Sequence, residues 1–339
     1  MKEDMVQIHS QDGMLEGRLA WPASAEQEVP CVILLHPWGA WDMDGSHHAD
    51  MSMDDQPVRM FLQIRDAIVD EGIAVLRYNS RFVPASNDSA MNYQRRTFSG
   101  LVEDACAAVD LVRNTYGIKA EAVWLLGISL GTEVAIAASE KAPSLKGLIL
   151  MSTIGENYLY RRYYMDVERK LQWLWEQQLV EKDGAVKVEA LRELALPRWG
   201  WWDNLEDELQ TLESASYEQI ASILKSHYDK NLARDLQFGN EEAPSEFWQE
   251  WISNEPAYKR ITPFTGHICI MQASDDNATP IREAYLLKNA LKDRSNVSFT
   301  VFDQLGHIFS PRRGDARRTY GPIASEVLSF LAHYLEENN

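Results

Sequence analysis

The stretch Val123–Ala138, VWLLGISLGTEVAIAA, decides the fold. It opens with a short apolar run typical of a buried strand, Val123–Leu126, and it ends with an apolar run typical of a helix. Ser129 lies between these runs, with Gly127 and Gly131 on either side. A serine in a strained strand-to-helix turn needs glycine at both places, because only then do strand and helix approach closely. The stretch therefore predicts a nucleophile, Ser129, at the end of a central strand.

Apolar runs and amphipathic segments alternate on both sides of this stretch. Such a rhythm predicts an α/β fold with a doubly wound, mostly parallel sheet. The first 30 residues predict a β-hairpin in front of it. We expect further strands within Cys31–Gly39, Ile73–Ser80, Lys146–Ser152, His267–Gln272 and Asn296–Phe302, and helices within Pro57–Gly72, Leu101–Arg113, Ile281–Lys292 and Gly321–Leu335.

The alternation stops near Thr153 and resumes only at Gly266. The residues between are rich in Glu, Gln, Leu and Trp and contain no strand-like apolar run, so they predict several amphipathic helices. We therefore expect a helical cap over residues 154–261, inserted between two parts of one core, residues 1–153 and 262–339.

Composition narrows the class of partner. The chain has 339 residues and a formal net charge of −18, which argues against a nucleic acid or an anionic membrane surface and favours a small-molecule substrate. Cys31, Cys106 and Cys269 lie in apolar runs and predict reduced, buried thiols. The N-terminal stretch lacks basic and apolar leader regions, and no run of about 18 apolar residues occurs, so we expect a cytoplasmic protein without a membrane span. A homodimer stays open.

Two later strand ends carry the partners that a serine nucleophile needs. Asp276 follows the strand HICIMQ, and His307 follows the last strand in LGHIFSP. Acyl transfer by serine requires a base for the hydroxyl and a carboxylate that orients the base, and the order Ser, Asp, His suits an α/β sheet. Taken alone, Asp276 could equally be a turn or N-cap residue, and a histidine such as His307 is more often a surface loop residue. Asp275 is the alternative to Asp276 as the acid.

The reaction also needs two N–H groups for a developing oxyanion. The Leu130 amide, at the start of the helix after the nucleophile, is one candidate. The loop His36–Gly39, HPWG, should supply the other from Trp38, because Pro37 has no N–H group. The alternative is that HPWG is merely a tight turn.

These motifs together resemble the serine α/β-hydrolases, and the resemblance covers nearly all of the chain outside the cap. The chain is most similar to bacterial esterases and acyl hydrolases related to the prolyl oligopeptidase and dienelactone hydrolase groups. Its acidic loop WDMDG, its strand RYNSRFVPAS and its segment FWQEWISNEPAYKRI carry that likeness. The sequence departs from the family pattern at Pro37, Phe82, Pro84 and Ala273, and these departures leave the triad intact.

The remaining signals concern the substrate. One loop contains two histidines and three aspartates: His47, His48, Asp42, Asp44 and Asp50. Their spacing matches no metal site, so we expect no metal and no cofactor. Aromatic residues of the cap should wall an apolar pocket together with His36, and the candidates are Tyr160, Trp199, Trp201 and Trp202. Arg161 and Arg162 indicate a solvated helix start, with binding of a substrate carboxylate as the alternative.

The sequence thus predicts a serine hydrolase that cleaves an ester, thioester or lactone of a bulky hydrophobic substrate through an acyl-enzyme. An acyltransferase would use the same residues while excluding water. A ligand-binding protein on the same fold is the alternative without turnover.

Overall fold

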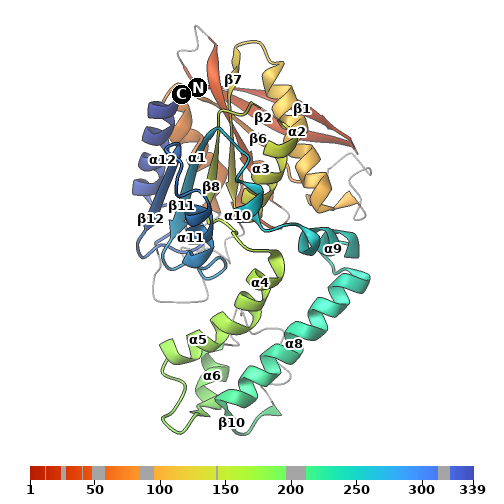
Figure 1. Ribbon diagram of the computed structural model, residues 1–339, viewed down its shortest axis with the longest axis vertical. Helices are drawn as coiled ribbons and strands as arrows, with labels where there is room; N and C mark the ends of the chain where they lie inside the picture. The colour runs from red at the N-terminus through yellow and green to blue at the C-terminus, as the bar shows by residue number, and fades with distance from the viewer. Residues whose placement is uncertain are drawn as a thin grey trace.

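The computed structural model describes residues 1–11, 13–23, 28–39, 41–47, 58–83, 95–142, 144–195, 211–311 and 321–339. An eight-stranded sheet forms its centre (Figure 1). The strands from β6 to β12 are parallel, whereas the N-terminal hairpin pairs in antiparallel fashion, as predicted. In spatial order they are β1 (Lys2–Ser10), β2 (Gly13–Trp21), β6 (Ala74–Tyr78), β3 (Val29–Leu35), β7 (Ile118–Ile128), β8 (Gly147–Met151), β11 (His267–Ala273) and β12 (Val297–Phe302).

Helices cover both faces of the sheet. Helices α1 (Met60–Val69) and α12 (Ser325–Asn338) pack on one face, and α2 (Phe98–Arg113), α3 (Leu130–Lys141) and α11 (Ile281–Ala290) pack on the other. Successive residues of β3 alternate between these two cores: Ile33 faces α2 and α3, and Val32 and Leu34 face α1 and α12. Because both faces are covered, the central strands are apolar throughout, as in doubly wound folds.

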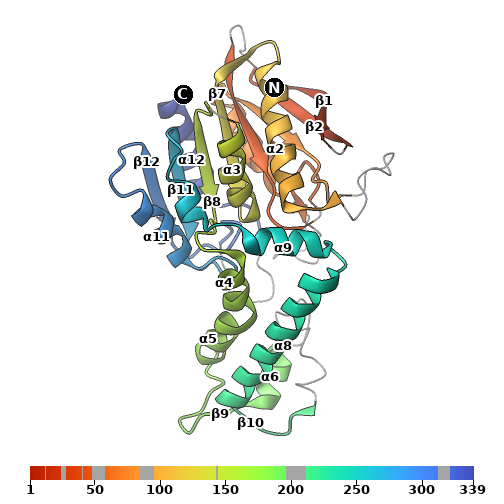
Figure 2. The same cartoon turned by 45° about the vertical axis from the view of Figure 1, so that its right-hand side comes forward.

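A helical arm extends from the end of the sheet at which β8 terminates, opposite the two chain termini (Figures 1 and 2). A hydrophobic cluster of its own, which includes Trp173 and Leu191, stabilises the arm. A capping box formed by Ser216 and Gln219 begins its longest helix. In its described residues the arm contains α4 (Tyr158–Tyr163), a π-helical segment (Tyr164–Glu168), α5 (Arg169–Glu176), α6 (Val188–Ala195) and α8 (Tyr217–Phe238), with the short strands β9 (Ala185–Val186) and β10 (Ala215–Ser216).

The strand pair β9–β10 differs from the expectation of helices alone. Each strand has two residues, which is too short for a period of two to show in the sequence. Two further short strands, β4 (Ser46–His47) and β5 (Val58–Arg59), pair with each other in antiparallel fashion.

Helices α9 (Ser245–Ser253) and α10 (Ala257–Arg260) bring the chain back from the arm to the sheet. Phe247, Trp248 and Trp251 of α9 are buried in the same core as α2 and α3, so these residues belong to the packing of the sheet layer. The three cysteines are unpaired thiols, as predicted; Cys31 and Cys269 are buried and Cys106 is partly buried. None of the helices in the described ranges has the length and apolar character that crossing a membrane requires.

Candidate active site

Ser129 lies in the turn between β7 and α3, with only 1% of its surface exposed. Its backbone is left-handed, with φ at 54° and ψ at −118°, a conformation that strains a residue other than glycine. A Cβ atom on Gly127 would lie 2.1 Å from the Gly131 carbonyl oxygen, and one on Gly131 would lie 2.4 Å from the Leu35 oxygen. Both positions therefore require glycine, and the turn has the form of a nucleophile elbow.

His307 and Asp276 meet beyond the ends of β12 and β11, and both are buried. The His307 Nδ1 atom is 2.9 Å from each carboxylate oxygen of Asp276. Burial raises the pKa of Asp276, but His307 and the hydrogen bonds from Thr279 outweigh it, so the pKa lies below its usual value. Asp276 is therefore an ionised acceptor that holds the proton on Nδ1 and leaves Nε2 as the basic nitrogen.

Two polar side chains hold the Asp276 carboxylate in place. The Thr279 hydroxyl donates to Oδ2 at 2.6 Å, and Gln272 donates to the same oxygen at 3.2 Å. Asp275, the alternative acid, instead accepts the Ser274 hydroxyl at 3.3 Å. The sequence reasoning missed Gln272 and Thr279, although the Asp-x-x-Thr spacing is a recognisable signal for a turn in which an Asp side chain accepts main-chain N–H groups.

Ser152, at the end of β8, also supports the site and was not predicted. Its hydroxyl donates to the main-chain oxygen of His307, and its N–H group donates to the Met271 oxygen at 3.0 Å. Its φ of 51° is left-handed, a conformation that residues other than glycine adopt uncommonly. Strand β8 lies between the strands of the nucleophile and the acid, so Ser152 ties the histidine loop to the centre of the sheet.

The Ser129 hydroxyl forms no hydrogen bond in this structure, so its link to His307 is not made here. Such catalytic hydrogen bonds are often long before a substrate binds and shorten in the complex. The main chain of Ser129 is held firmly, because its carbonyl oxygen accepts the Thr132 N–H at 2.9 Å and the Thr132 hydroxyl at 2.6 Å.

The two predicted oxyanion donors, Trp38 and Leu130, keep their amides available. No hydrogen bond among the described residues uses either N–H group. Leu130 is the first residue of α3, where a helix presents unpaired N–H groups and positive potential. The Trp38 carbonyl accepts the Trp41 indole at 2.7 Å, which fixes the peptide on the other side of Trp38.

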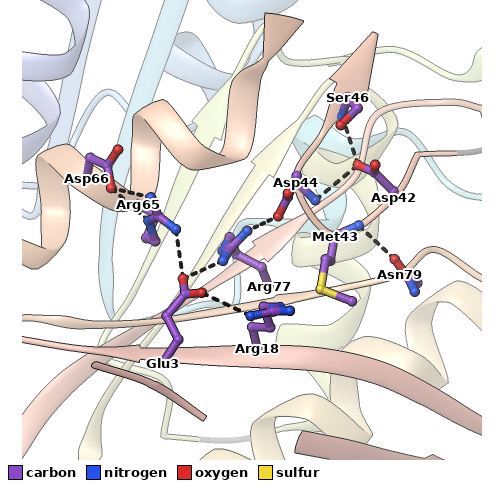
Figure 3. A network of polar contacts seen from close by, with 10 residues as sticks. All are labelled: Glu3, Arg18, Asp42, Met43, Asp44, Ser46, Arg65, Asp66, Arg77 and Asn79. Carbon is purple, nitrogen blue, oxygen red and sulfur yellow. Dashed lines mark hydrogen bonds and ion pairs between the residues drawn. The ribbon is translucent and has the colours of Figure 1, made fainter. Parts of the chain in front are cut away.

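A network of ion pairs holds the acidic loop that follows Trp38 (Figure 3). Arg77, with 1% of its side chain exposed, binds Asp44 of the loop and Glu3 of β1. Asp42 accepts the main-chain N–H groups of Asp44 at 3.0 Å and Ser46 at 2.9 Å. These carboxylates are thus engaged in structure, and the described residues contain no group of His, Cys, Asp and Glu suited to a metal ion. His48 and Asp50 lie outside the described residues.

The predicted substrate-binding residues are only partly brought together. His36 is buried against Phe61 and Tyr78, with ring centroids at 5.0 and 5.4 Å, and burial lowers its pKa to about 4. It lines a small cavity of about 20 Å³ with Leu130 and Ser80, room for about one water molecule. Tyr160 lies on α4 under the Arg282 guanidinium, 3.8 Å from the ring centroid. Trp199, Trp201 and Trp202 lie outside the described residues.

The expectation of a solvated helix start at Arg161 and Arg162 is wrong. Only 6% and 8% of their surfaces are exposed. Arg162 pairs with Asp235 of α8 at 2.8 Å, and Arg161 lies over the Trp251 ring, 5.9 Å from its centroid. Amphipathic spacing does not reveal that α8 and α9 pack over this face of α4.

Comparison with known proteins decides the family. A family model described as serine aminopeptidase, S33 matches residues 58–310. The chain belongs to this serine α/β-hydrolase family. Residues 58–310 include Ser129, Asp276 and His307, and the fold prediction made from the sequence is thereby confirmed.

Relatives of this S33 family member include proteins named as esterases. Esterase EstD of Thermotoga maritima is 24% identical over 333 residues, which cover 95% of this chain and 65% of the relative. The chain thus spans about two thirds of the length of that curated protein. Among solved structures, the esterase domain of a Rhodothermus marinus protein has a TM-score of 0.54 at 16% identity and matches 99% of both chains. The α/β hydrolase GrgF from Penicillium sp. sh18 has a TM-score of 0.56 at 15% identity and matches 100% of this chain and 99% of its own. At these identities the solved structures establish the fold alone.

Proposed function

We propose that this hydrolase is a serine esterase that forms an acyl-enzyme on Ser129. The observation that carries the proposal is the buried contact between His307 and Asp276, 2.9 Å long, together with the strained backbone of Ser129 at the end of β7. An imidazole oriented by an ionised carboxylate is the base that a serine hydroxyl needs, because serine alone is a weak nucleophile. A ligand-binding protein would need neither the strained turn nor the buried ion pair.

In the proposed reaction the Ser129 Oγ attacks the carbonyl carbon of the ester while its proton passes to Nε2 of His307. The carbonyl oxygen becomes an oxyanion, which the amides of Trp38 and Leu130 bind. The tetrahedral intermediate collapses, the C–O bond to the alcohol breaks, and His307 returns the proton to the leaving oxygen. Water, deprotonated by His307, then releases the acid and restores the Ser129 hydroxyl.

Esters, thioesters and lactones are favoured over amides as substrates, because their leaving groups need less protonation. The Thermotoga relative is named an esterase, which supports an ester as the substrate. We expect the hydrophobic acyl group to lie at the start of the arm, where the aromatic rings of Tyr158 and Tyr164 are buried. Burial also raises the pKa of Tyr164 to about 12. The charge of Asp276 contributes to that rise, so Tyr164 lies within electrostatic range of the triad.

A fluorophosphonate probe tests the proposal. We expect covalent labelling of the wild-type protein and loss of labelling in Ser129→Ala and His307→Ala. Hydrolysis of p-nitrophenyl esters of increasing acyl length should follow the same pattern and rise from acetate toward longer chains. An unlabelled wild-type protein would contradict the serine mechanism, and activity confined to acetate would contradict the hydrophobic acyl pocket.

A further inference from the structure

Helix α9 lies at the end of the sheet where the arm begins (Figure 2). It contacts the loop His36–Gly39, here called the oxyanion loop, through Trp38. The Trp38 ring packs on three aromatic rings of α9, with centroid distances of 4.8 Å to Phe247, 5.0 Å to Trp248 and 5.8 Å to Trp251. Its indole N–H also donates to Glu242, just before α9, at 2.8 Å. The side chain of Trp38 is therefore held by the segment that returns from the arm, and not by the sheet alone.

Trp251 makes a second contact, with the helix that carries the nucleophile. Its indole N–H donates to the Glu133 carboxyl at 2.7 Å. Glu133 is on α3, one turn beyond Leu130, and both partners are buried, with 1% and 6% of their surfaces exposed. The Tyr158 ring of α4 stacks on the Trp251 ring, with their centroids 3.8 Å apart. Trp251 is thus clamped in position and touches both elements that bear an oxyanion donor.

We propose that Trp251 is a positioning residue for the oxyanion hole, holding the Trp38 loop and the Leu130 end of α3 at the separation at which their amides converge. This inference rests on the proposed function, since it concerns the same two amides. Donors must lie about 2.7–3.1 Å from the oxyanion, and a displacement of about 1 Å lowers rates by up to about 100-fold. A residue that fixes the distance between the two donors therefore acts on the transition state more than on the bound ester.

The contact between Trp251 and Glu133 is a directed hydrogen bond, which the packing of the two side chains alone would not need. Among the described residues, Trp251 is the one hydrogen-bond donor to the Glu133 carboxyl. Burial raises the pKa of Glu133 to about 8, although Trp251, Arg161 and Arg260 act in the opposite direction and Glu283 adds to the rise. At neutral pH the carboxyl is mostly protonated, so a neutral side chain with a carbonyl oxygen reproduces the acceptor.

Four variants test this role. Trp251→Phe removes the indole N–H and keeps an aromatic ring, and Glu133→Leu removes the acceptor; we expect both to lower kcat about tenfold. Glu133→Gln keeps a carbonyl acceptor and should retain kcat within about threefold. Trp173→Phe, the same change in the separate core of the arm, is the matched control and should leave kcat within about twofold.

The readout separates positioning from folding. Rates are expressed per active site counted with the fluorophosphonate probe, so loss of folded protein does not register. The hydrolysed ester is p-nitrophenyl butyrate, and phenylboronic acid, whose tetrahedral adduct on Ser129 places an oxygen where the oxyanion forms, reports the donors directly. We expect its inhibition constant to rise by the same factor as kcat falls, with KM within about twofold.

If Trp251→Phe has the wild-type kcat and the wild-type inhibition constant for phenylboronic acid, the positioning role of Trp251 is overturned. If Ser129 is labelled in that same variant, the esterase proposal is unaffected. Absence of labelling in the wild type would instead remove the esterase proposal itself. If Trp251→Phe does not fold, Glu133→Leu and Trp38→Phe carry the same expectation, since Trp38→Phe preserves the main-chain donor but loses the bond to Glu242.

Discussion

Replacing Glu133 by glutamine is expected to stabilise the protein, and to do so increasingly as the pH rises. Glu133 is 6% exposed, and burial raises its pKa from 4.5 to about 8. Between these values the folded protein keeps a proton that the unfolded chain releases. The unfolded state therefore gains stability relative to the folded state as the pH rises through this window. Glutamine resembles the protonated carboxyl and does not titrate.

The size of the effect follows from the two pKa values. One pKa unit corresponds to about 1.36 kcal/mol, so the rise from 4.5 to about 8 amounts to about 5 kcal/mol once the pH exceeds both values. At pH 7 the preference of the unfolded chain for ionised Glu133 has lowered the unfolding free energy of the wild type by about 3 kcal/mol, and at pH 4.5 it has lowered it by almost nothing. We therefore expect Glu133→Gln to match the wild type near pH 4.5 and to exceed its unfolding free energy by about 3 kcal/mol at pH 7.

Urea unfolding followed by tryptophan fluorescence measures this difference at several pH values from about 4.5 to 9. Subtracting the wild-type curve from the variant curve removes the groups that titrate equally in both proteins. Glu283 is the exception, because its charge contributes to the raised pKa of Glu133. Glu121→Gln, at a side chain that is 72% exposed, is the matched control and should show no growing difference. A constant difference between Glu133→Gln and the wild type would refute the reasoning.

Two more substitutions probe the triad and the loop network. Asp276→Asn should lower kcat about 10³–10⁴-fold, because an amide no longer holds the proton on Nδ1 of His307. Stopped-flow kinetics per labelled active site measures this loss. A loss below about tenfold would contradict the assignment of Asp276 as the acid. Arg77→Met should lower the unfolding free energy by up to about 3 kcal/mol, since Glu3 and Asp44 lose their common partner but are partly exposed. The Glu3 pKa is below its usual value, because Arg65 and Arg77 outweigh the effect of its burial. Stability from Glu3 is thus present above the unfolded pKa and lost as the pH falls, and the variant should lose part of this acid sensitivity in the same urea assay.

The sheet and the positions of the three residues of the proposed triad could be predicted from the sequence because their signals are local. Apolar runs alternate with amphipathic segments from Cys31 onward, and the C-terminal ends of parallel strands meet at one edge. Asp276 and His307 each come soon after such a strand, so the predicted positions of the strands were enough to predict the positions of both residues. The sequence predicts Asp276 as the acid with Asp275 as its competitor; in the structure Asp276 lies 2.9 Å from Nδ1 of His307, whereas Asp275 accepts the Ser274 hydroxyl.

Contacts between distant segments could not be predicted. The Ser152 hydroxyl bonds the His307 carbonyl, 155 residues later, and requires a left-handed backbone that a serine seldom adopts. The segment FWQEWIS predicts an amphipathic helix, but spacing does not reveal that its rings pack on Trp38. Arg161 and Arg162 were misread for the same reason, because the helices that bury them lie far along the chain.

The Trp251–Glu133 pair is a contact between distant segments, and its effect on stability differs from its effect on the geometry of the site. A buried carboxyl that must release its proton at higher pH destabilises the fold, and apolar side chains of similar volume at both positions would often be neutral or stabilising. Apolar packing, however, fixes no direction, whereas one short hydrogen bond between α9 and α3 sets both their separation and their orientation. If the pair serves geometry, the double variant Glu133→Leu/Trp251→Phe, which replaces both partners of the hydrogen bond, should lower kcat while it raises or preserves the unfolding free energy. If the pair merely fills the core, activity and stability should change in the same direction.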